Sequence, residues 1–258
     1  NAGDAEQIDS TIAGFKSSLK YTGDANIDWC QIGQQIEYKN YAHLVGKDVT
    51  ISFYAKANNA NGGSTALVAR TRSVTGEDGS ALFAGGNTDT SVTISTTAAR
   101  YTVARTIPAN SKGFSVEFAL GAHVNTDGLE ITGIQLELGT VTEFEHRGIG
   151  EELALCERYF QLVPQVGLAY AGATTTVDTC VPYRTPMRAA PTITAIAAIT
   201  VTNVTAADFA QSSANITGSI SVGASSAHLR LGNFSSLTTS DMYLCRNGDM
   251  NVAAAAEL

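Results

Sequence analysis

The chain has 258 residues, of which 44% are hydrophobic and only 16% are charged, and it carries a net charge of −8. That length is enough to bury a substantial core in one large domain or two modest ones. Phosphate backbones attract clustered Lys and Arg, so the acidic balance argues against nucleic-acid binding. The sequence has no apolar run of about 18 residues, the length that a membrane-spanning helix requires, so membrane insertion is not expected.

Alternation of apolar and polar residues predicts β-strands along most of the chain. The alternation is clear in residues 49–57, 116–120 and 193–201. Turn sequences rich in Gly and Asn, such as those at 61–63 and 125–128, separate the runs. Many short strands with frequent glycine turns indicate an all-β sandwich rather than alternating βαβ units.

Residues 129–160 are predicted to pass from a strand into the one clear helix. Apolar residues alternate along 129–138, and the shift of their parity across Gly133 and Ile134 predicts a β-bulge. Helical spacing then places Leu153, Cys156 and Phe160 on one stripe of a short helix over 150–160. Two glutamates in its first turn suit the positive end of the helix dipole.

Four segments together resemble a known family. They read QQIE followed by LVGKDVTISFYAKA at 34–57, RYTV followed by IPA at 100–109, QLELGTVTEFEHRGIGEELALCERYF at 135–160, and VPYRTPMRAAPT at 181–192. These runs resemble the carbohydrate-binding-module-like jelly roll of tailed-phage virion proteins and the segment that follows it in phage tail fibres. The matched motifs are framework residues and contain no reaction centre.

The resemblance implies a jelly-roll β-sandwich, then a short helix, then a second and smaller β-sandwich domain. We expect the jelly roll over 1–146, a hinge with the helix over 147–163, and an oligomer-forming C-terminal β domain over 164–258. The family usually has one or two further strands before the segment seen here at 8–21. We therefore expect the sequence to begin inside its first domain.

The C-terminal composition predicts self-association. Between Thr192 and Ser240, 17 of 49 residues are Ser or Thr and nine are Ala, and the charged residues are Asp208 and Arg230. A flat, weakly charged sheet of this kind risks edge-to-edge aggregation unless other subunits cover it. We expect a homotrimer to which this region contributes contacts.

Aromatic residues near the start of the jelly roll are the glycan-binding candidates. They are Trp29, Tyr38 and Tyr41, with Asn40 between the two tyrosines as a polar neighbour. Flat rings can stack on the C–H face of a sugar while polar side chains hold its hydroxyls. The alternative is that Trp29 packs in the core and that the tyrosines lie on an ordinary loop.

Arg184, Met187 and Arg188 are the candidates for subunit contacts. They accompany three prolines in a segment whose composition is typical of an edge strand. A basic site for an acidic surface polysaccharide is the alternative for the same segment.

The sequence predicts neither a catalytic site nor a cofactor. The four histidines are far apart, and the chain contains no G-x-S-x-G or H-E-x-x-H motif. Acidic turns such as the one at 87–89 offer oxygen ligands for a structural calcium, but no calcium-loop motif is present, so no metal is expected. The four cysteines show no C-x-x-C pair and are expected to be free, mostly buried thiols.

These expectations favour a non-enzymatic structural protein on the surface of a tailed-phage virion, assembled in the cytoplasm of the bacterial host. The first interpretation is a trimeric fibre or spike component that contacts other virion proteins and binds a host-surface glycan or receptor. The second is a capsid decoration or head-fibre protein that stabilises the shell. A polysaccharide depolymerase is the third, and it would require a catalytic carboxylate pair that the motifs do not show.

Overall fold

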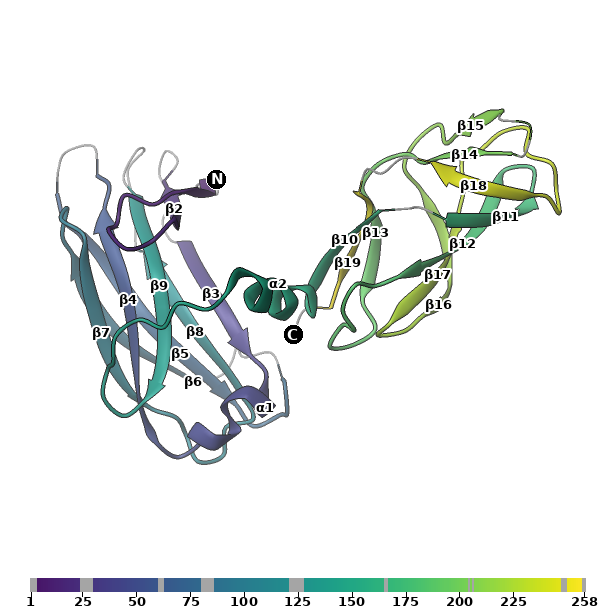
Figure 1. Ribbon diagram of the computed structural model, residues 1–258. Helices are drawn as coiled ribbons and strands as arrows, with labels where there is room; N and C mark the ends of the chain where they lie inside the picture. Colours follow the sequence, from purple (N-terminus) through teal and green to yellow (C-terminus); the bar gives the residue numbers. More distant parts are fainter. Residues whose placement is uncertain are drawn as a thin grey trace. The chain divides into compact units, whose positions relative to one another are not determined.

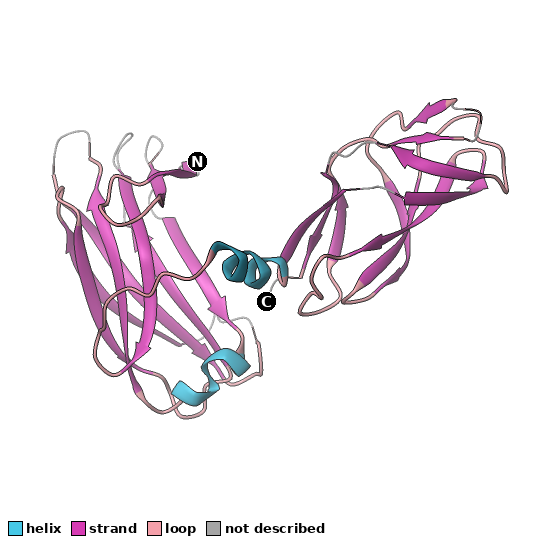
Figure 2. Cartoon of the chain, in the orientation of Figure 1, coloured by secondary structure: helices cyan, strands magenta, loops and turns pink. Residues whose placement is uncertain are grey.

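The computed structural model describes residues 4–23, 30–59, 63–79, 86–120, 128–164, 167–203, 205, 207–246 and 250–256. Strands dominate these residues (Figure 2). The chain divides into two compact units, Asn1–Glu145 and His146–Glu257.

The first unit contains two antiparallel sheets (Figure 1). The five-stranded sheet has the order β1 (Asp4–Asp9), β2 (Ser17–Thr22), β9 (Gly128–Leu138), β4 (Asp48–Ala57) and β7 (Ala99–Thr106). The four-stranded sheet has the order β3 (Cys30–Ile36), β8 (Gly113–Leu120), β5 (Thr65–Val74) and β6 (Gly86–Ile94). Non-sequential neighbours such as β2 and β9 are typical of jelly-roll connections. The predicted all-β jelly-roll sandwich is confirmed.

The core of the first unit lies between its two sheets. Alternate residues of β4 point inward, and Ile51 and Phe53 have no exposed surface. The Phe53 ring packs edge-on against Phe118 of β8, with ring centroids 4.8 Å apart. Arg105 of β7 also spans the sandwich, because its guanidinium donates to the Ala69 carbonyl at 2.8 Å. Strands β5 and β8 are therefore anchored from inside, which leaves their outward side chains for other contacts.

The predicted bulge in β9 is confirmed. Ser52 pairs with Gln135 and Tyr54 pairs with Thr132, so Gly133 and Ile134 together oppose the single residue between them on β4. Gly133 has a φ of +56°, the left-handed conformation that glycine adopts readily at such bulges.

The second unit also contains two antiparallel sheets. The three-stranded sheet has the order β10 (Phe160–Pro164), β19 (Met250–Ala255) and β13 (Thr192–Ala195). The seven-stranded sheet has the order β15 (Asp208–Ala210), β14 (Thr200–Thr202), β18 (Met242–Arg246), β11 (Gly167–Ala173), β12 (Thr176–Pro182), β17 (Ser226–Leu231) and β16 (Ile216–Val222). Val163 and Val252 of the smaller sheet share a core with Val177 and Leu229 of the larger one. The expected second β-sandwich is thus present.

Two sequence predictions in this unit need correction. The run at 193–201 is not one strand, because β13 joins the three-stranded sheet and β14 joins the seven-stranded sheet. Helix α2 covers Ile149–Glu157, so it ends before Phe160, which begins β10 and pairs with Ala255. None of the residues of α2 is buried by the described part of the chain.

The cysteines differ from expectation in their burial. All four are free, but only Cys245 is buried, whereas Cys156 and Cys180 are exposed. Among the described residues, no helix is long and apolar enough to cross a membrane.

Candidate functional site

The structure places Tyr41 in the core, which corrects its assignment as a glycan candidate. Helix α1 (Tyr38–Tyr41) follows β3, and Tyr41 is 1% exposed. Its ring packs against Phe114 at 5.4 Å and its hydroxyl lies 3.1 Å from Ser111 Oγ. Burial is the main cause that raises the pKa of Tyr41. A ring enclosed in this way offers no face to a sugar.

Tyr38 and Asn40 remain candidates at the surface. Tyr38 is half-buried, with its ring edge-on to Tyr41 at 5.6 Å, and its backbone N–H donates to Asp78 Oδ1 at 2.7 Å. Asn40 is exposed. Trp29, the third aromatic candidate, lies outside the described residues, so the grouping of these aromatics stays a prediction.

Gln161 holds the proline-rich segment in place within the second unit. The Gln161 amide donates to the Thr185 carbonyl at 2.6 Å and its oxygen accepts the Arg184 N–H at 2.9 Å. Met187 is 4% exposed and packs with Ala254 and Ala256, so it is a contact within the chain and not a subunit contact. The half-exposed Arg184 guanidinium lies 3.4 Å from Glu157, and the role of Arg184 and Arg188 in subunit contacts remains a prediction.

A polar surface covers the outward side of the four-stranded sheet. Strand register places Gly33, Glu117, Arg70 and Asp89 in one row across β3, β8, β5 and β6. The next row contains Gln35, Ser115, Arg72 and Asn87. Their strand neighbours Leu67, Ala69, Phe114 and Phe118 point into the core, so these side chains point away from it. We call Gln31, Arg70, Arg72, Asn87, Asp89, Ser115 and Glu117 the charged face.

Glu117 is the buried centre of the charged face. It has no exposed surface, although its strand position points away from the core. Its carboxylate accepts hydrogen bonds from Arg72 Nε at 3.0 Å, from Ser115 Oγ at 2.8 Å, and from the Gln31 side-chain amide. A buried carboxylate requires such partners, because an unpaired buried charge is costly.

Arg70 and Asp89 form the second part of the charged face. Arg70 donates from Nε and Nη2 to the two Asp89 oxygens, both at 2.7 Å, and from Nη1 to Gln31 Oε1 at 3.4 Å. These hydrogen bonds lower the pKa of Asp89 to about 2. Asn87 Nδ2 also donates to Asp89, at 3.2 Å. Residues 87–89, predicted as an acidic turn, belong instead to β6, and both Asp89 oxygens accept hydrogen bonds from Arg70.

The charged face is a single network of planar polar groups. Gln31 joins its two halves, since its amide contacts Glu117 on one side and Arg70 on the other. Guanidinium, carboxylate and amide groups held in place suit the recognition of a polar ligand with adjacent hydroxyls. Among the described residues there is no group of three or more His, Cys, Asp or Glu that could hold a metal ion.

Sequence reasoning missed this site because its residues come from four separate strands. Arg70 and Arg72 show the alternation of one strand, but Glu117 lies 45 residues beyond Arg72. The buried glutamate in the apolar run 113–120 was the available signal, because a charge there requires a partner.

Comparison with known proteins gives only distant structural similarity. No family model matches the chain, and no curated protein matches it. The enzymatically active domain of tailspike protein 4 from bacteriophage CBA120 is 15% identical with a TM-score of 0.41, over 54% of this chain and 18% of that one. A carbohydrate-binding module, TmCBM61, in complex with β-1,4-galactotriose is 12% identical with a TM-score of 0.38, over 54% and 86%.

The xylan-binding CBM22-1 domain of Xyn10C from Paenibacillus barcinonensis is similar to the same degree. It is 14% identical with a TM-score of 0.37, over 54% of this chain and 83% of that domain. Structural similarity at these TM-scores assigns neither a family nor a ligand to this chain. The chain spans less than a fifth of the tailspike chain.

Proposed function

We propose that the chain is a non-enzymatic surface protein of a tailed-phage virion and that its first unit binds a host-surface glycan at the charged face. The motifs at 34–57, 100–109, 135–160 and 181–192 support the virion assignment through their resemblance to phage jelly rolls. The buried carboxylate of Glu117 and its partners support the binding site.

The charged face supports glycan binding because its polar groups are held in position. Arg72 is 13% exposed and Arg70 is 14% exposed, and each is oriented by a carboxylate. The remaining Arg72 N–H groups and the exposed Asn87 amide can bond adjacent sugar hydroxyls with little loss of side-chain entropy. The sheet thus supplies a rigid polar platform, which suits a weak site repeated in several copies.

Self-association, which the proposed trimer requires, is supported by an apolar strip on the outward side of the seven-stranded sheet. Leu168 pairs with Leu244 and Tyr170 pairs with Met242 across β11 and β18. All four are exposed, Leu168 at 66%. Contiguous apolar surface of this kind marks an association site. In the proposed fibre, other copies of the chain cover this strip.

Two matched asparagine variants test the location of the glycan site. The measurement is the binding of purified protein to polysaccharide extracted from the host surface, by isothermal calorimetry. We expect Asn87→Ala to weaken binding because it removes an amide of the charged face, and Asn40→Ala, at the α1 surface, to leave binding unchanged. The reverse result would move the site to α1, and absence of binding by the unaltered protein would reject a glycan role.

A further inference from the structure

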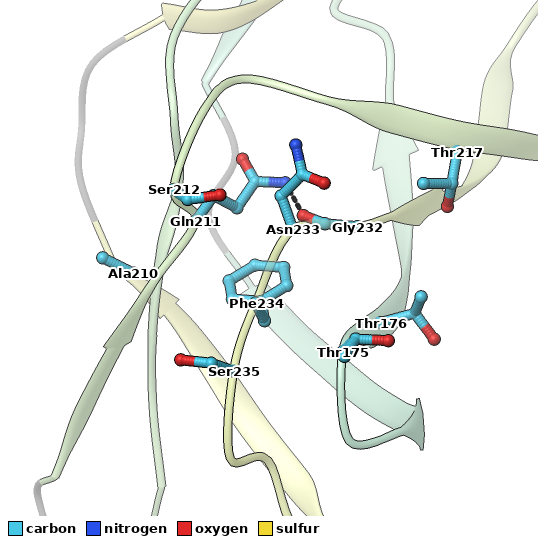
Figure 3. Close-up of a pocket in the computed structure, with 10 residues that line it drawn as sticks. All are labelled: Thr175, Thr176, Ala210, Gln211, Ser212, Thr217, Gly232, Asn233, Phe234 and Ser235. Atoms are coloured by element: carbon cyan, nitrogen blue, oxygen red, sulfur yellow. Dashed lines mark hydrogen bonds between the residues drawn. The ribbon is translucent and has the colours of Figure 1, made fainter.

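The second unit contains a pocket of about 640 Å³ that belongs to no site described above (Figure 3). It lies between the start of β12, the segment after β15 and the segment after β17. Its lining consists of Thr175, Thr176, Ala210, Gln211, Ser212, Thr217, Gly232, Asn233, Phe234 and Ser235. Small-molecule sites in proteins range from about 300 to 1,000 Å³, so the volume suits a small ligand.

The lining is polar but contains no ionisable side chain. Thr175, Ser212 and Ser235 are exposed and Thr176 is half-buried, so their hydroxyls are accessible to a ligand. The Asn233 amide donates to Ser213 Oγ at 2.8 Å, which leaves its carbonyl oxygen as an acceptor. Figure 3 shows the Phe234 ring between the Asn233 amide and the Ser235 hydroxyl. Because Phe234 is 4% exposed and packs in the core, the pocket offers chiefly neutral donors and acceptors.

Gln211 makes this arrangement rigid. It is 6% exposed, and its amide donates to the Gly232 carbonyl at 2.7 Å and to the Asn215 carbonyl at 3.1 Å. Its oxygen accepts the Ile199 N–H at 2.9 Å. Gly232 in turn packs so closely on Thr217 that a Cβ there would lie 2.3 Å from Thr217 Cγ2. The segment that carries Asn233 and Phe234 is thus fixed from both sides.

Asn233 itself adopts an uncommon backbone conformation. Its φ is 64°, and that of Ser236 is 62°, in the left-handed region that few non-glycine residues occupy. Such conformations persist where the surrounding structure holds them, and they are frequent at ligand sites. The conformation turns the Asn233 side chain toward the pocket (Figure 3).

We propose that this pocket is a second binding site, specific for one or two units of a neutral saccharide. A charged sugar would lose hydration without gaining an opposite charge in the lining. A purely apolar ligand would leave the hydroxyls of the lining without partners. A neutral saccharide satisfies both requirements, because it carries no charge and its hydroxyls bond to Ser, Thr and Asn. The site is separate from the charged face and does not depend on it.

The test is saturation-transfer NMR on the full chain with four probes. Galactose and N-acetylglucosamine are the neutral probes, and glucuronic acid and N-acetylneuraminic acid are the acidic ones. The pocket variants are Thr176→Val, which keeps the strand shape, and Asn233→Gly, which keeps the left-handed backbone. Thr194→Val, on the exposed side of β13, is the matched control, and Asn87→Ala reports on the charged face.

We expect a neutral probe to bind and each pocket variant to weaken that binding by roughly three- to tenfold, as expected for one lost hydrogen bond. Thr194→Val should leave this binding unchanged. Failure of both neutral probes to bind would overturn the proposal, as would stronger binding of an acidic probe that the pocket variants abolish. Binding that depends on Asn87 alone would overturn the second site and leave the proposed function standing.

Discussion

At the scale of single residues, Glu117 links the stability of the first unit to its proposed binding site. Its carboxylate has no exposed surface and accepts hydrogen bonds from Arg72, Ser115 and Gln31. Arg72 itself is only 13% exposed. Removing one member of such a pair leaves the other charge poorly solvated and without a partner.

Glu117→Ala should therefore lower the free energy of unfolding of the first unit by about 3 kcal/mol. The measurement is urea denaturation followed by the fluorescence of the chain's aromatic residues. Glu143→Ala, at an exposed position, is the control and should change the same quantity by less than about 0.5 kcal/mol. Equal effects of the two variants would show that the pairing of Glu117 with Arg72 does not contribute to the free energy of unfolding.

The Arg70–Asp89 pair makes stability depend on acid pH. Because Arg70 lowers the folded-state pKa of Asp89 from 3.8 to about 2, the ionised carboxylate stabilises the folded chain above pH 4. That contribution is lost as the pH falls through the interval from about 4 to 2. Asp89→Asn should be less stable than the unaltered chain at pH 6, and the two should converge near pH 2. A difference in melting temperature that stays constant over this interval would contradict the assignment.

At the scale of elements, the bulge in β9 depends on the absence of a side chain at Gly133. A Cβ there would lie 2.5 Å from the Phe15 ring and 3.0 Å from the Tyr54 ring. Gly139 has a similar φ of +71° but has no heavy atom within 4 Å of a built Cβ. Comparing substitutions at the two glycines therefore separates the cost of backbone strain from the cost of steric overlap.

Gly139→Ala should cost about 1–2 kcal/mol, the penalty for a left-handed backbone with a Cβ. Gly133→Ala should cost about 1–3 kcal/mol more, because the aromatic rings must also move. Chemical denaturation of both variants measures the difference. If both glycines respond equally, the ring contacts at the bulge do not constrain β9.

The sequence predicted those elements that depend on residues adjacent in the chain. Period-2 alternation located β4, and the parity shift at Gly133 located the bulge, because both patterns are written in adjacent residues. The end of α2 was missed because Phe160 pairs with Ala255, almost a hundred residues away. Likewise, Met187 is buried by Ala254 and Ala256. Nothing in the sequence of the proline-rich segment indicates this contact.

The charged face shows the same limit for the candidate site. Alternation located only part of β8, at 116–120, and residues 87–89, which read as a turn, belong to β6. The order of the strands in the sheet was not predictable. Only the pairing of β3 with β8 and of β8 with β5 brings Gln31 and Arg72 to Glu117. Tyr41 was interpreted as part of a surface loop, but it packs in the core.

At the scale of the whole molecule, the apolar strip on β11 and β18 predicts self-association. Light scattering at micromolar concentration should return three times the 26.9 kDa chain mass. Leu168→Gln combined with Leu244→Gln should lower the measured mass, because polar groups would then be buried in the contact. Leu138→Gln, at an exposed position of the first unit, is the control and should leave the mass unchanged. A monomer mass for the unaltered chain would contradict the trimer.

Adsorption competition tests the central claim, that this protein carries a host-binding site, most directly. Host cells are saturated with the purified chain, phage are added, and the unadsorbed phage are counted. The proposed function predicts that adsorption falls in proportion to the bound protein and that Asn87→Ala blocks it less well. Undiminished adsorption at saturating protein would contradict host binding and would favour the role of a capsid decoration protein.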